Sequence, residues 1–146
     1  MIRLTKTEII LASLASSNGA THTPIQVQKL LFLIDKKVAD KLGGPFFNFT
    51  PYDYGPLDKE VYAVLSELAN QNQVEIISNI ELRWNKYRLT PEGQNLGCKI
   101  LKGLSGDLSE YIEKLSAFIR SLSFVELVSV IYSAYPEMKV NSVFQK

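Results

Sequence analysis

The chain has 146 residues, which fits a single domain, and its 16 basic and 15 acidic residues leave a net charge of +1. Hydrophobic residues make up 46% and charged residues 21%, an ordinary globular composition that argues against disorder. The near-neutral balance lacks the strongly basic field that marks many nucleic-acid-binding proteins. We therefore expect one domain over residues 1–146, and its function has to be sought in local features.

The single cysteine and the single histidine exclude several kinds of chemistry. Cys98 cannot form a disulfide within the chain, and a zinc site built on paired cysteines needs more thiols. His22 comes just before a helix-capping signal, where we expect a solvated loop residue rather than a catalytic base. The sequence contains no nucleophile elbow, phosphate-cradling loop or metal-ligand cluster. We therefore expect no enzymatic activity, no metal and no cofactor.

The hydropathy pattern predicts a cytoplasmic protein. Charged residues occur close to the N-terminus, at Lys6 and Glu8, so no signal peptide fits. The longest uncharged run, Ile9 to Gln28, is interrupted by serine, asparagine, glycine and proline, which a membrane span would not tolerate. We therefore expect no membrane partner.

Two strong helix signals lie in the first third of the chain. The capping box Thr5–Glu8 opens a predicted helix that should end at Asn18-Gly19. A second capping box, Thr23–Gln26, has proline at the first helical position, and Gly43-Gly44 should stop that helix. Its apolar stripe is broad, so we expect it to be the most buried helix of the domain. The stripe consists of Val27, Leu30, Leu31, Phe32, Leu33, Ile34 and Val38.

The segment Pro45–Pro56 is unusually aromatic, with three phenylalanines and two tyrosines in PFFNFTPYDYGP. Its spacing fits neither a helix nor a strand, so we predict an ordered loop with a short extended piece at Phe46–Phe49. A third helix should begin at Pro56 and run to about Asn70. Two interpretations of the aromatic side chains stay open. They fold over the core as a lid, or some of them anchor a partner.

The second half of the chain predicts a β-hairpin followed by helices. Val74–Ile77 and Ile80–Leu89 should pair around a turn at Ser78-Asn79. Thr90-Pro91 should open the next helix, and two further helices should follow, the last ending at Pro136. The fold class that results is mostly α (α+β): a winged-helix-like helical domain with a small β-hairpin and a C-terminal helical pair.

Four short motifs, taken in order, resemble the Panacea, or SocA-like, antitoxin domain family. They are Gln28-Lys29-Leu30-Leu31-Phe32, Tyr54-Gly55-Pro56-Leu57-Asp58-Lys59-Glu60-Val61-Tyr62, Tyr87-Arg88-Leu89-Thr90-Pro91-Glu92-Gly93 and Tyr132-Ser133-Ala134-Tyr135-Pro136-Glu137. The resemblance spans roughly residues 24 to 142 and is closest to small stand-alone YwgA-like bacterial members. It implies a helical module of toxin–antitoxin systems, also found in phage and mobile-element contexts. Such a module neutralises a partner toxin by direct contact or acts as an adaptor. Over residues 1–146 we expect no appended helix-turn-helix domain of the kind some members carry.

A partner protein, toxin-like and encoded nearby, is therefore the expected ligand, with a second copy of the chain as another possible partner. We place the contact surface at Tyr52, Asp53, Tyr54 and Asp58, at the aromatic loop and the start of the third helix. Tyrosine offers a large rigid surface with a polar tip, which suits a binding hot spot. Asp53 between the two tyrosines would add charge selectivity.

A DNA-binding winged helix is the alternative function. Its wing would use Arg83, Lys86 and Arg88 to contact phosphates. The predicted third helix, however, carries three acidic residues (Asp58, Glu60 and Glu67) against one basic residue, a net charge of −2. A helix with that charge would repel the phosphates. We therefore expect any nucleic-acid binding to be weak and indifferent to sequence.

Overall fold

The computed structural model describes residues 3–79, 81 and 84–143. These residues are mostly helical with two small antiparallel sheets, which confirms the mostly α (α+β) class. The elements are α1 (Lys6–Ala15), α2 (Pro24–Lys37), α3 (Ala39–Leu42), β1 (Thr50–Tyr52), β2 (Gly55–Leu57), α4 (Lys59–Asn70), β3 (Val74–Asn79), β4 (Trp84–Leu89), α5 (Pro91–Lys102), α6 (Gly106–Ser121), α7 (Phe124–Ala134) and the short 3₁₀ helix η1 (Pro136–Lys139). No described helix is long and apolar enough to cross a membrane.

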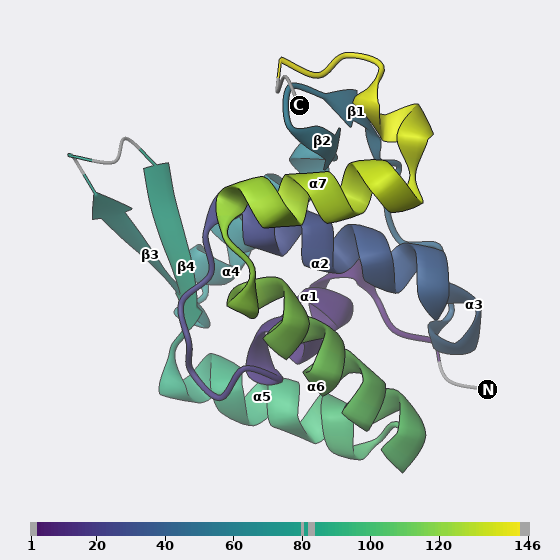
Figure 1. The fold of residues 1–146 in the computed structure, drawn as a ribbon. Coiled ribbons are helices and arrows are strands. Elements are labelled where there is room, and N and C mark those ends of the chain that lie inside the picture. Colours follow the sequence, from purple (N-terminus) through teal and green to yellow (C-terminus); the bar gives the residue numbers. More distant parts are fainter. Residues whose placement is uncertain (1–2, 80, 82–83, 144–146) are drawn as a thin grey trace.

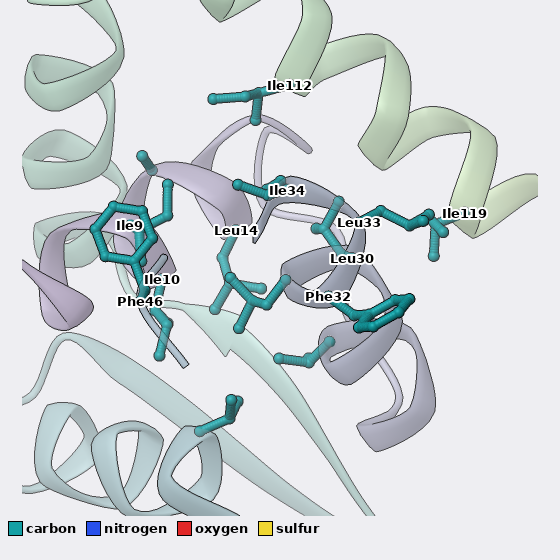
Figure 2. Close-up of a cluster of buried hydrophobic side chains, with 14 of the residues drawn as sticks. Ile9, Ile10, Leu14, Leu30, Phe32, Leu33, Ile34, Phe46, Ile112 and Ile119 are labelled. Carbon is teal, nitrogen blue, oxygen red and sulfur yellow. The ribbon is translucent and has the colours of Figure 1, made fainter. Parts of the chain in front are cut away.

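The core is built around α1 and α2. Figure 1 shows α2 running through the middle of the molecule, with α7 along one side and α5 and α6 on the other. In Figure 2, Ile112 and Ile119 of α6 face the apolar residues of α2, and Phe46 lies beside Ile9 and Ile10 of α1. The expectation that α2 is the most buried helix holds for the number of buried residues, which is eight of fourteen in α2 and seven of ten in α1. The buried fraction is higher in the shorter α1, which packs against α2, α4, α5 and α6.

The helix starts follow the capping signals. Thr5, Thr23 and Ser123 each close a complete capping box with the acidic or amide side chain three residues later. Thr90 caps α5 by accepting a hydrogen bond from the backbone N–H of Gly93 at 3.1 Å. The helix ends depart more from expectation. The first helix stops at Ala15, before the turn at Asn18-Gly19, and α2 stops at Lys37, so that Gly43 ends the short α3 instead.

The aromatic segment contains a second hairpin that the sequence analysis missed. β1 and β2 pair antiparallel, with Pro51 opposite Pro56, whereas the predicted extended piece at Phe46–Phe49 forms no strand. Instead, the backbone N–H groups of Phe46 and Phe47 donate to the Asp35 carboxylate at 2.9 Å each. The third helix begins at Lys59 rather than Pro56, because Asp58 is its cap and Pro56 is part of β2.

The larger hairpin, β3–β4, confirms the predicted pairing of two strands and corrects the position of their turn. Tyr87 and Leu89 of β4 are buried. The turn is not at Ser78-Asn79, because β3 continues through Asn79 and Ser78 pairs with Asn85. The predicted start of the second strand, Ile80, lies outside the described residues.

Candidate functional site

Two of the four motifs that carry the family resemblance meet in space. The Gln28 side chain of α2 accepts a hydrogen bond from the backbone N–H of Asp58 and donates one to its carbonyl, both at 3.0 Å. The neighbouring Lys29 donates from Nζ to the carbonyl oxygen of Pro56 at 3.1 Å. The Gln-Lys pair of α2 therefore holds the backbone at the exit of β2, and with it the β1–β2 hairpin.

The β1–β2 hairpin presents two tyrosines to solvent. Tyr52 is 46% exposed and Tyr54 is 43% exposed, and Asp53 between them is exposed as well. The hairpin is supported by the C-terminal segment, which lies next to it in Figure 1. The N–H of Val143 donates to the carbonyl of Asp53 at 2.9 Å, and the Asn141 side chain donates to Pro51 at 3.2 Å. The turn is therefore anchored at its base, and its aromatic side chains stay available.

The phenylalanines of the aromatic segment behave differently from its tyrosines. Phe46 is buried, and Phe47 and Phe49 are half-buried against the core. Phe49 also makes an edge-to-face contact with Phe32 of α2, with ring centroids 5.5 Å apart. The lid interpretation therefore describes the phenylalanines. The partner-binding interpretation stays a prediction for the tyrosines.

A pocket of about 700 Å³ opens between the hairpin, the start of α2 and the start of α7. Its walls are mainly apolar, and Tyr52, Tyr54 and Phe124 line it. The rings of Tyr54 and Phe124 pack edge to face with centroids 5.1 Å apart. The apolar walls include Ile25, Leu57, Leu122 and Leu127.

Lys29 also lines this pocket, and the sequence analysis did not single it out. Its side chain is almost fully buried, with 3% of the residue exposed, and burial lowers its pKa to about 7. The spacing of Lys29 from apolar residues of the same helix could have indicated that its side chain is buried. Lys29 follows Ile25 by four residues and precedes Phe32 and Leu33 by three and four, so it lies on an apolar face of the helix. Phe124, another pocket residue that the sequence analysis did not single out, carries no such signal.

Asp58, the fourth predicted partner-binding residue, caps α4. One carboxylate oxygen accepts from the backbone N–H of Glu60 at 2.9 Å and the other from that of Asn48 at 2.8 Å. Both oxygens are therefore engaged within the chain, and the carboxylate connects the aromatic segment to the helix. Tyr52, Asp53 and Tyr54 form one surface, whereas Asp58 positions the backbone beneath it.

His22 is not the solvated loop residue that we expected, because it is fully buried. Its backbone forms a β-bridge with Tyr87, with N–H to carbonyl distances of 2.8 and 2.9 Å. Neither ring nitrogen meets the full geometry of a hydrogen bond with a described residue. Burial lowers its pKa to about 4, the Arg120 guanidinium adds to this, and the Ala20 carbonyl opposes it. His22 is therefore part of the packed interior of the domain.

The structure describes two of the three predicted nucleic-acid residues, Lys86 and Arg88. Arg88 is paired with Glu75 across the hairpin at 2.6 Å, and Lys86 is half-buried. Arg83 lies outside the described residues. On α4, Glu60 pairs with Lys6 of α1.

Within residues 3–79, 81 and 84–143, no group of histidine, cysteine and acidic residues is arranged to hold a metal ion. Cys98 is half-buried, and the Gln94 amide lies 3.3 Å from its sulfur. No family model, curated protein or solved structure matches this chain.

Proposed function

We propose that this protein is an interaction module that neutralises or sequesters a partner protein by direct contact, as the resemblance to Panacea-like antitoxins implies. The observation that carries the proposal is the apolar pocket with Tyr52, Tyr54 and Phe124 at its exposed side. A pocket lined by aromatic side chains is the setting in which hot-spot residues of a partner dock.

The β1–β2 hairpin supports this function because its conformation is set before binding. Gly55 adopts a φ of 108°, and Pro56 follows it in β2. Hydrogen bonds donated by Lys29, Gln28 and Val143 to backbone carbonyls hold the chain on both sides of the turn. A partner would therefore meet an ordered surface, which reduces the entropy lost on association.

The first prediction concerns the exposed hairpin. Replacing Tyr52 and Asp53 together with Ala should weaken binding of the partner, tested with the product of the neighbouring gene, by ~2 kcal/mol or more. The melting temperature should change little, because both side chains are exposed. Binding would be measured by calorimetry on the purified pair, and folding by a thermal melt.

Two variants calibrate this result. Tyr111→Ala removes a tyrosine of similar exposure from α6, away from the pocket, and should leave the affinity unchanged. Leu31→Ala removes a core side chain and should destabilise the fold by ~2–5 kcal/mol. If the variant with Ala at both Tyr52 and Asp53 unfolds as readily as Leu31→Ala, the hairpin is a structural lid. If that variant stays folded and binds the partner with full affinity, the interface lies elsewhere.

The second prediction separates this function from DNA binding. Duplex DNA should bind weakly, with an affinity that falls steeply with salt and does not depend on sequence, because α4 is acidic and Arg88 is already paired. A filter-binding salt titration measures this, and the triple change of Arg83, Lys86 and Arg88 to Glu should abolish the residual binding. A tight, sequence-specific complex at physiological salt would favour the transcriptional regulator instead.

A further inference from the structure

The Lys29 amine is buried at the wall of the pocket. Its Nζ donates one hydrogen bond, to the Pro56 carbonyl. Among the described residues, the three ion pairs involve other lysines and arginines, and none includes Lys29. A buried ammonium is stable only when an anion or several acceptors compensate for lost hydration. The pocket therefore contains an amine that, when protonated, has no anionic partner among the residues that the structure describes.

The surrounding backbone brings the amine and the pocket together. A Cβ atom at Gly55 would lie 3.3 Å from Cε and 3.5 Å from Nζ of Lys29. The glycine thus lets the hairpin pass close to the amine without a side chain between them. Asp53 and Tyr54 of the hairpin and Tyr62 of α4 also line the pocket, and the Tyr132 ring of α7 is within 3.5 Å of the same Cβ position.

We propose that this pocket binds a carboxylate carried on an apolar group of the partner protein, and that Lys29 forms the ion pair with it. The inference rests on the proposed function and specifies the chemistry of the partner's docking segment: an acidic residue or chain terminus next to an apolar side chain. The apolar walls would accept the side chain, while Lys29 would select the charge. A protein occupant fits better than a free small acid because exposed Tyr52 and Tyr54 extend the apolar surface beyond the pocket.

Binding of a carboxylate should be coupled to protonation of Lys29. The free protein has a Lys29 pKa of about 7, and a bound anion would raise it. Below that pH the amine is already charged and the affinity is highest. Above it, binding must take up a proton, so the affinity falls by up to roughly tenfold per pH unit.

The test uses two matched probes, N-acetyl-leucine and N-acetyl-leucinamide, which differ only in the charged carboxylate. Titration of the full chain, followed by amide chemical shifts at pH 6, should show roughly tenfold tighter binding of the acid at the pocket. At pH 8 the ratio should shrink. Calorimetry in two buffers of different ionisation enthalpy should then show proton uptake with the acid and none with the amide.

Two substitutions assign the effect to Lys29. Lys29→Met keeps the length and apolar stem of the side chain and should reduce the acid-to-amide ratio to about one. Lys41→Met removes an exposed lysine of α3 that does not line the pocket, and should leave the ratio unchanged. Should Lys29→Met fail to fold in a thermal melt, the proton uptake of the unmodified protein still decides the question.

The outcomes separate this inference from the proposed function. Equal binding of the two probes, or no binding of either, overturns the carboxylate site, while loss of the partner in the Tyr52 and Asp53 variant still supports the interaction surface. If the acid is selected by Lys29 but the partner binds equally to the Lys29→Met variant, the occupant is a free small acid, and the assignment to the partner protein is overturned.

Discussion

Acidification from pH 7 to about pH 4 should lower the free energy of unfolding by about 3 kcal/mol through His22 alone. In the unfolded chain, His22 takes up a proton at the ordinary histidine pKa of 6.5. In the folded chain, its ring stays neutral until about pH 4. The unfolded state binds more protons in this window, so falling pH favours unfolding. Domains of this size are stable by ~5–15 kcal/mol, so the loss is a large share of the total.

Urea denaturation at several pH values in this window measures the effect, with His22→Leu as the reference. That variant should keep the fold and lose most of the acid sensitivity. Other groups also titrate here: the capping hydrogen bonds from Ser123 lower the pKa of Glu126, and burial raises that of Asp35. Because these groups are common to both proteins, the difference between the two curves isolates His22. Parallel curves would mean that the folded protein accepts the proton without penalty.

The second large effect should come from Gly93→Ala, which we expect to destabilise the fold by about 3 kcal/mol or more. A Cβ atom at this position would lie 1.9 Å from the carbonyl oxygen of Gln73. That oxygen accepts the N–H of Thr90, the cap of α5, so it cannot move without disturbing the entry to the helix. The clash should outweigh the gain of up to ~1 kcal/mol that alanine normally brings to a helix.

The matched control is Gly106→Ala, at the start of α6, where nothing lies within 4 Å of the added atom. This change should leave stability unchanged or raise it slightly. Thermal and urea denaturation of both variants provide the comparison. A larger loss of stability in Gly93→Ala would mean that packing against Gln73 explains the glycine at the end of the Tyr87–Gly93 motif. If both variants behave alike, the close approach of Gly93 to Gln73 does not constrain the fold.

The sequence predicted best what depends on near neighbours. Each capping box was recognised because its hydroxyl and its partner are three residues apart, and the helix begins where they meet. The exposure of Tyr52 and Tyr54 matches one of the two interpretations that the composition of the aromatic segment left open. Helix ends were less accurate, because α1 stops before its turn signal.

Only the tertiary structure decided the features that join distant segments. His22 is buried because its backbone bridges Tyr87, and nothing near His22 in the sequence announces that pairing. The β1–β2 hairpin depends on contacts with α2, α7 and η1. Lys29 is a polar group in an apolar pocket because its amine donates to the carbonyl of Pro56. That acceptor lies twenty-seven residues further along the chain, and only folding brings it next to Lys29. Local conformational preferences act between residues a few positions apart, so they can be inferred from the sequence. Burial and pocket formation depend on which surfaces the folded chain brings together.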